Sequence, residues 1–207
     1  ARNIREASDL TTLARDNTAI KLISLDVTSE NNMKQIAADV KCKIDILVCN
    51  AGVLNGYGGL ESEAHHSHAI ETVFMTNIAG VFFTARSFLP HLVKKNKKSQ
   101  NQSGTCGKIA VISSIMGSQE RAGSNAPIYR ASKAAATNLA RSLAIELAPR
   151  GIAVGAYHPG WVRTDMGGPS ADVSAQESAA GLLARFDRLD ISNTGVYESY
   201  DGEKIPF

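Results

Sequence analysis

The sequence is poor in cysteine, carries little net charge and lacks a long uninterrupted apolar run. Its 207 residues include three cysteines, Cys42, Cys49 and Cys106. An odd number without a Cys-x-x-Cys pair argues against both a disulfide framework and a zinc site. Lys and Arg number 22 against 20 for Asp and Glu, a formal net charge of +2. This balance gives no reason to expect nucleic acid or an anionic membrane as a partner.

Membrane and secretion signals are also missing from the sequence. No stretch approaches the roughly 18 uninterrupted apolar residues of a membrane helix, and the N-terminal region has no short apolar core like that of a signal peptide. His65, His66 and His68 stand close together, but without a second cluster we expect them in a solvated turn and predict no metal site. We expect a cytoplasmic protein.

What is present is an alternation of apolar strands and helical segments. With 43% hydrophobic residues, the chain can bury one core, so we expect a single domain over 1–207. The patterns predict strands over 20–25, 44–49, 108–113 and 152–157 and around 195–199, and helices over 4–15, 30–40, 66–93, 127–147 and 175–186. This alternation predicts a doubly wound α/β fold of the Rossmann type, with helices on both faces of a parallel sheet.

A glycine-rich turn normally follows the first strand of such a dinucleotide fold. No G-x-G-x-x-G pattern or close variant precedes Asp26, and the chain begins at Ala1 in what resembles the end of a second strand. We therefore expect about 30 or more residues upstream of Ala1, the size of one βαβ unit.

Polar residues follow each of the predicted strands. They are Asp26, the turn 50–52 (NAG), the pair Ser113 and Ser114, and the turn 158–160 (HPG). Each alone is typical of ordinary turn chemistry. Because ligands of open parallel sheets bind beyond the carboxyl ends of the strands, together they predict one binding rim.

Tyr129 and Lys133 stand four residues apart at the start of a predicted helix, which places both on one face. A tyrosine that exchanges protons near neutrality needs its phenolate stabilised by about 3–4 kcal/mol. A neighbouring ammonium acts in that direction. Such a pair is common by chance, but Ser114 adds a hydroxyl that could polarise a carbonyl oxygen at the end of the adjoining strand.

These residues resemble the signature of the short-chain dehydrogenase/reductase family. The run 129–133 (YRASK), with 114–117 (SIMG) before it, looks like the active-site signature, and 50–52 (NAG) is similar to the NNAG element. Asn77 in 76–80 (TNIAG) matches the helix asparagine, and 159–160 (PG) with Thr164 resembles the segment after the sixth strand. The stretches 158–169 (HPGWVRTDMGGP) and 200–202 (YDG) suggest the C-factor-like and sniffer-like carbonyl reductase branch.

The resemblance implies a role for each matching residue. Tyr129 would exchange the proton with the substrate oxygen, Ser114 would hold that oxygen, and Lys133 would bind the nicotinamide ribose and lower the tyrosine pKa. Asn77 would anchor a water of the proton relay. Contacts with the adenosine half are implied for Asp26, Val27, Asn50, Ala51 and Gly52, and contacts with the nicotinamide end for Pro159, Gly160, Val162 and Thr164. Hydride transfer itself belongs to the cofactor.

Two departures from the family pattern are the missing glycine-rich turn and Cys49, which replaces the first asparagine of NNAG. We expect the cysteine to change a structural hydrogen bond more than catalysis.

For the cofactor, Ala1 stands where NAD-dependent proteins carry an acidic residue, and Arg2 follows it. A guanidinium can bind the extra phosphate with paired bonds, so we expect NADP(H) over NAD(H). The competing interpretation is a surface arginine near a helix start.

Other features allow two interpretations. Leu139, Leu143 and Leu147 form a stripe that would be core, although helices at this place in the family often form subunit contacts, so a homodimer or homotetramer is expected. The lysines of 94–98 (KKNKK) would complement a helix end rather than form a localisation signal. Trp161 and Met166 would line an apolar pocket or pack under a loop. The main hypothesis is a reductase of small or medium carbonyl compounds, which could also run in reverse as an alcohol dehydrogenase. The alternative is a noncatalytic relative that senses a nucleotide or signals through partners.

Overall fold

A parallel sheet forms the centre of the computed structural model, which describes residues 1–93 and 104–207. Its strands, in spatial as well as chain order, are β1 (Ile46–Cys49), β2 (Gly107–Ile112), β3 (Ile152–His158) and β4 (Tyr197–Ser199). All three pairings are parallel. The inner strands β2 and β3 are almost wholly buried, as expected where helices cover both faces.

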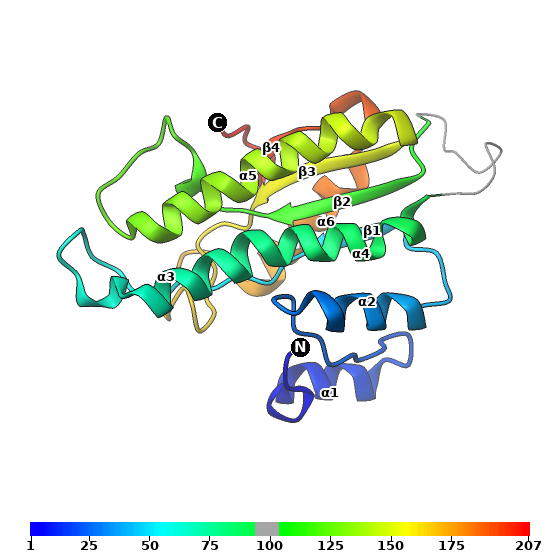
Figure 1. The fold of residues 1–207 in the computed structure, drawn as a ribbon, viewed down its shortest axis with the longest axis horizontal. Helices are drawn as coiled ribbons and strands as arrows, with labels where there is room; N and C mark the ends of the chain where they lie inside the picture. Colours follow the sequence, from blue (N-terminus) through cyan, green and yellow to red (C-terminus); the bar gives the residue numbers. More distant parts are fainter. Residues whose placement is uncertain (94–103) are drawn as a thin grey trace.

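Helices cover both faces of the sheet (Figure 1). On one face, α4 (Gly80–Leu92) and α5 (Pro127–Leu147) enclose the largest apolar core, which contains Ile109, Val111 and Val154 of the strands. On the other face, α6 (Ala175–Arg188) packs through Phe186 against Tyr157. The doubly wound fold predicted from the sequence is therefore confirmed. The leucine stripe also belongs to this core: Leu143 and Leu147 are buried, and Leu139 packs against them.

The predicted helix over 66–93 is a continuous run of 26 residues, Ser67–Leu92. It consists of α3 (Ser67–Phe74), a π-helical turn (Met75–Ala79) and α4. The run is long and apolar enough to cross a membrane by length and composition alone, with a mean hydropathy of 1.2. In this fold it packs on the sheet and α5, and the π turn buries the polar side chains of Thr76 and Asn77.

The N-terminal part of the chain adds α1 (Ser8–Asp16) and α2 (Glu30–Asp39) at one side of the sheet (Figure 1). As predicted, Ser29 caps α2, and its hydroxyl accepts a hydrogen bond from the amide of Asn32. Met33 and Ala37 of α2 are buried with Phe88 of α4. Short 3₁₀ turns complete the described structure at Ile4–Glu6, Glu63–His65, Ile115–Gly117, Ala148–Arg150 and Ile191–Asn193.

The predicted strand over 20–25 is wrong. This segment does not join the sheet. The amide of Leu25 donates to the Ala1 carbonyl at 2.9 Å, the Ala1 amine donates to the Ile23 carbonyl at 3.3 Å, and the Ile20 amide donates to the Asn17 carbonyl at 3.0 Å. Leu25 instead packs against the α2 cluster. The apolar side chains of the run are half-buried rather than buried. An apolar run that packs against a helix has the same sequence pattern as one that pairs in a sheet. The lysine run 94–98 lies outside the described residues.

Candidate active site

A cleft of about 850 Å³ opens at the carboxyl ends of β1, β2 and β3. Sequence motifs that are far apart in the chain meet there. Of the predicted site residues, those that line the cleft are Asn50, Gly52, Ser114, Tyr129, Lys133, Pro159, Gly160, Val162 and Thr164. The volume lies within the range of about 300–1,000 Å³ found for small-molecule sites.

Helix α5 positions Tyr129 and Lys133 within its first two turns. Pro127 starts the helix, and the amide of the preceding Ala126 donates to the Gly58 carbonyl at 3.0 Å, which fixes the helix start against the loop after β1. Tyr129 is 9% and Lys133 4% exposed. The Lys133 Nζ atom donates to the Ile112 carbonyl at 2.9 Å, so the ammonium is held by the end of β2.

Ser114 lies two residues after the end of β2 and is the N-cap of the 3₁₀ turn Ile115–Gly117. Its hydroxyl accepts a bond from the Met116 amide at 3.2 Å, and its carbonyl accepts one from the Tyr197 hydroxyl. The turn lies directly on α5, because a Cβ atom at Gly117 would be 2.7 Å from the carbonyl carbon of Lys133. The glycine thus allows the close approach that sets Ser114 beside the helix bearing Tyr129 and Lys133.

The pKa shifts of these groups have burial as their largest cause. Burial raises the pKa of Tyr129, a hydrogen bond with Ser114 opposes this shift, and the neighbouring Tyr57 adds to it. Burial also lowers the pKa of Lys133 to about 8. Both shifts disfavour the charged forms. A phenolate and an ammonium formed at this place would stabilise each other, because each would supply an opposite charge close to a group that has lost its contact with water.

Asn77 lies behind the cleft, in the π turn, and is 1% exposed. Its Oδ1 accepts from the Val53 amide at 2.8 Å, while its Nδ2 donates to the Val53 carbonyl at 3.0 Å and to the Ser132 hydroxyl at 2.9 Å. Both amide hydrogens are therefore used by the protein, which leaves a lone pair on Oδ1 for the predicted water. The contacts join the turn after β1 to α5. A π turn often marks a functional position of this kind.

The residues predicted to contact the adenosine half lie mostly outside the cleft. The Asp26 carboxylate accepts from the amide and hydroxyl of Thr28 at 2.9 and 2.7 Å, and these bonds hold its pKa below the ordinary value, with a smaller contribution from the charge of Arg2. Val27 packs on α4, where a Cβ at Gly80 would be 2.8 Å from its Cγ2. Ala51 is exposed and does not line the cleft.

Cys49, the departure from the NNAG element, is 5% exposed and belongs to the core beneath α4 and α5. Burial raises the pKa of its thiol to about 12, so the thiol stays protonated and unreactive at neutral pH. Among the histidines, His66 caps α3 by accepting a bond from the Ala69 amide at 3.3 Å, and His65 contacts the Gly58 carbonyl at 3.3 Å.

The apolar part of the cleft was only partly predicted. Trp161 and Met166 line it, and the Trp161 indole donates to the Gly167 carbonyl at 2.8 Å. Sequence reasoning missed residues from two other segments. Leu54 and Tyr57 come from the loop after β1, and Ala175, Ser178, Ala179 and Leu182 come from α6. The α6 residues are spaced i, i+3, i+4 and i+7, which is the pattern of one helix face and could have indicated them.

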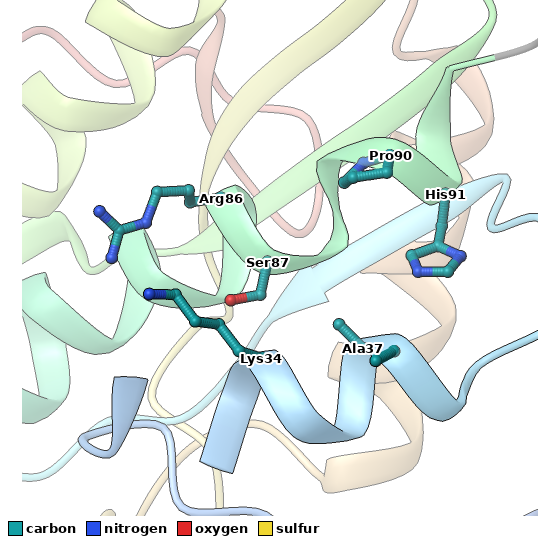
Figure 2. A pocket seen from close by; sticks show the side chains of 7 residues that line it. Lys34, Ala37, Arg86, Ser87, Pro90 and His91 are labelled. Atoms are coloured by element: carbon teal, nitrogen blue, oxygen red, sulfur yellow. The ribbon is translucent and has the colours of Figure 1, made fainter. Parts of the chain in front are cut away.

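A second hollow, of about 530 Å³, lies between α2 and α4 (Figure 2). Lys34 and Arg86 approach its edge from the two helices, and Ser87 lies between them. Both cations pair with the same carboxylate, that of Glu30; Arg86 lies 2.8 Å from it. None of the predicted site residues lines this hollow, so the chemistry is assigned to the cleft at the strand ends.

Similar proteins are known by sequence and by structure. The profile of the short chain dehydrogenase family matches residues 2–174. C-signal of Myxococcus xanthus is 33% identical over 165 residues, covering 79% of this chain and 93% of that protein. The carbonyl reductase Sniffer of D. melanogaster superposes with a TM-score of 0.91 at 27% identity, covering 100% of this chain and 86% of that one. The NADPH-bound carbonyl reductase from chicken fatty liver gives a TM-score of 0.83 at 29% identity, covering 97% and 82%. This chain therefore belongs to the short-chain dehydrogenase family and is an NAD(P)-dependent oxidoreductase.

Proposed function

We propose that this enzyme transfers hydride between NADP(H) and small or medium neutral carbonyl or alcohol compounds. The observation that carries the proposal is the meeting of Ser114, Tyr129 and Lys133 in one cleft at the strand ends. This arrangement supports catalysis over the noncatalytic alternative, because a protein that only senses a nucleotide has no need of a buried phenol beside a hydroxyl and an ammonium.

In the proposed reaction, Tyr129 gives its phenolic proton to the substrate oxygen, which the Ser114 hydroxyl holds by a hydrogen bond. The developing phenolate is stabilised by the Lys133 ammonium, whose Nζ lies 5.6 Å from the centre of the Tyr129 ring. Asn77 has a positioning role, since it ties the turn beside Gly52 to α5 through Val53 and Ser132.

The cleft has features that suit a nicotinamide riboside. Among the described residues, the Lys133 ammonium has one hydrogen-bond acceptor, the Ile112 carbonyl, so further donors are available for ribose hydroxyls. Gly52 leaves the space beside the Lys133 ammonium open, because a Cβ atom at position 52 would be 3.3 Å from the Lys133 Nζ. Pro159, Gly160, Val162 and Thr164 would hold the nicotinamide end. When bound, this cofactor supplies or accepts the hydride.

Two observations support NADP(H) as the cofactor. Arg2 is exposed, and among the described residues its guanidinium has no hydrogen-bond partner, so it is free to bind a phosphate. The relative from chicken fatty liver is described as NADPH-bound. Asp26, Val27 and the turn at Asn50 and Ala51 would complete the adenosine side.

A neutral substrate is proposed because the cleft wall is largely apolar. Leu54, Met116, Trp161 and Leu182 line it, and Lys133 is its only charged lining residue among those described. Lys133 is already assigned to the phenol and the ribose, so the cleft offers no separate cation for a carboxylate or phosphate of the substrate.

We further propose a cytoplasmic enzyme that forms a homodimer or homotetramer. Exposed apolar side chains on the outer helices, Phe82 of α4 and Ile145 of α5, would be covered by subunit contacts. Light scattering coupled to size-exclusion chromatography tests the assembly, and a purely monomeric protein would contradict it.

The activity is tested by following the consumption of NADPH with a panel of neutral aldehydes and ketones. We expect turnover with several of them, at least for small aromatic or aliphatic carbonyl compounds that fit the cleft. Failure of the whole panel, with intact folding shown by circular dichroism, would contradict the proposed function.

A further inference from the structure

His158 is the last residue of β3 and the one histidine among the described residues that lines the cleft. The residue before it, Tyr157, packs edge-on against Phe186 of α6, with ring centroids 5.1 Å apart. Successive side chains of a strand point to opposite faces, so His158 faces the side of the sheet that carries α5. The Ser113 amide donates to the Tyr157 carbonyl at 2.7 Å, so the β2–β3 pairing continues up to the residue before Ser114.

The His158 ring is not tied to the protein around it. Its Nδ1 atom is buried without a hydrogen-bond partner, and the described residues offer Nε2 no partner either. The Nε2 atom is not fully buried, and it is therefore the ring nitrogen that a molecule in the cleft can reach.

Four charged groups face the ring from the elements packed around it. They are Lys133 of α5, Arg121 of the loop before α5, and Asp201 and Glu203 of the C-terminal segment. Arg121 pairs with Glu203 at 2.5 Å, and Asp201 accepts from the Glu203 amide at 3.1 Å. The two positive and two negative charges balance. Burial lowers the pKa of His158 to about 4, so the ring is neutral near pH 7.

A substrate that fills the cleft displaces water from Nε2, and an oxygen of the substrate that forms a hydrogen bond with Nε2 prevents this polar atom from being left unsatisfied in an apolar environment. Ser114 and Tyr129 are already assigned to the reacting oxygen. The surrounding walls at Met116, Trp161 and Leu182 are apolar. His158 is therefore available to a second polar group of the substrate.

We propose that His158 hydrogen-bonds a second oxygen of the substrate, so that the enzyme favours neutral compounds with another carbonyl or hydroxyl oxygen close to the reacting carbonyl. The two oxygens must be close because His158 and Ser114 lie at the carboxyl ends of neighbouring strands, and neighbouring strands are about 4.8 Å apart. A neutral ring among balanced charges offers a carboxylate no net attraction, so the oxygen proposed for this position is a neutral one. This inference rests on the proposed reductase function and assigns a selectivity to the same cleft.

The test compares 1-phenylpropane-1,2-dione with 1-phenylpropan-1-one, which lacks the second oxygen. With NADPH supplied, kcat/KM is measured for the wild type, His158→Leu and His158→Gln. We expect His158→Leu to lower kcat/KM for the dione about 3- to 10-fold, the effect of one lost hydrogen bond, and to leave the monoketone within about twofold. His158→Gln, which can place an amide nitrogen near the position of Nε2, should recover most of the loss. Each variant is compared with the wild type on the same substrate, so the greater intrinsic reactivity of the dione does not affect the ratio of the two kcat/KM values.

Tyr157→Phe is the matched control, since it removes a hydroxyl that has no partner on the opposite face of the sheet, and it should leave both substrates unchanged. An equal loss on both substrates in His158→Leu would indicate a structural role and overturn the proposal. No loss on the dione would overturn it as well, while the reductase function would stand. If the wild type turned over no neutral carbonyl compound at all, the proposed function would fail, and this inference with it.

Discussion

The Lys133 ammonium and the Tyr129 ring lie on the same face of α5, with Nζ 5.6 Å from the ring centre. The contact is fixed from outside the helix, because the same nitrogen donates to the Ile112 carbonyl at the end of β2. Burial raises the pKa of the phenol and lowers that of the amine. The two groups therefore stabilise each other most when the phenol has lost its proton, which is the state that a general acid reaches on protonating a substrate.

Tyr129→Phe should abolish turnover and leave the fold intact. It deletes only the hydroxyl that exchanges the proton, so we expect kcat to fall about 100-fold or more, with a Tm close to that of the wild type. Tyr157→Phe is the control and should keep full activity. A Tyr129→Phe variant that retains near wild-type turnover would refute the assignment of the general acid.

Lys133→Met should make the protein inactive but more stable at pH 7. The folded chain holds this amine at a pKa of about 8 instead of 10.5, a penalty of about 3 kcal/mol. Loss of the bond to Ile112 offsets about 1 kcal/mol of the gain. We therefore expect the free energy of unfolding to rise by about 2 kcal/mol, as is found when a functional group is removed from a buried site.

The gain from Lys133→Met should depend on pH. Between pH 8 and 10.5 the unfolded wild type binds a proton at Lys133 that the folded state does not, so wild-type stability contributed by this group rises with pH in that window. The advantage of the variant should be full below pH 8 and disappear toward pH 10.5. Urea unfolding at pH 7 and pH 9.5 measures the difference. A variant less stable than the wild type at pH 7 would show that burial does not disfavour the charged amine.

Asn77→Ala should destabilise the protein by about 3 kcal/mol. It removes three hydrogen bonds and leaves the amide and carbonyl of Val53 without their side-chain partner in a largely buried region. Asn138→Ala, on the exposed face of α5, is the control and should stay within about 0.5 kcal/mol of the wild type. Urea unfolding measures both. A loss below about 1 kcal/mol for Asn77→Ala would contradict its role in joining the turn to α5.

The sequence predicted most of the sheet and the convergence of Ser114, Tyr129 and Lys133 because these depend on local patterns. An apolar run such as 108–113 indicates a buried strand, and the i, i+4 spacing of Tyr129 and Lys133 fixes their common face. The segment 20–25 shows the limit of this reasoning. Leu25 packs against the α2 cluster, and the other apolar side chains of the segment are half-buried. No local pattern distinguishes this arrangement from pairing in a sheet.

The cleft walls were harder to predict for a related reason. Tyr57 and Leu182 line the cleft because tertiary packing brings the loop after β1 and α6 to the same place. The charges around His158 include those of Arg121, Asp201 and Glu203, which are more than 30 positions away from it in the sequence. The spacing of sequence motifs predicts neither the lining of the cleft nor the surroundings of His158.

Arg2→Ala should remove most of the preference for NADPH. The wild-type protein is expected to have a higher kcat/KM with NADPH than with NADH, since a free guanidinium binds the extra phosphate with charge-assisted bonds that a ribose hydroxyl cannot match. Arg2 lies close enough to Asp26 for its charge to lower the pKa of that carboxyl group. Loss of the guanidinium should therefore also leave the carboxylate freer to accept hydrogen bonds from the ribose of NADH. Arg15→Ala is the control, because this arginine pairs with the adjacent Asp16 at 3.1 Å at the far end of α1. Steady-state kinetics with both cofactors decide the matter: equal use of NADPH and NADH by the wild type, or an unchanged preference in Arg2→Ala, would reject the role of Arg2.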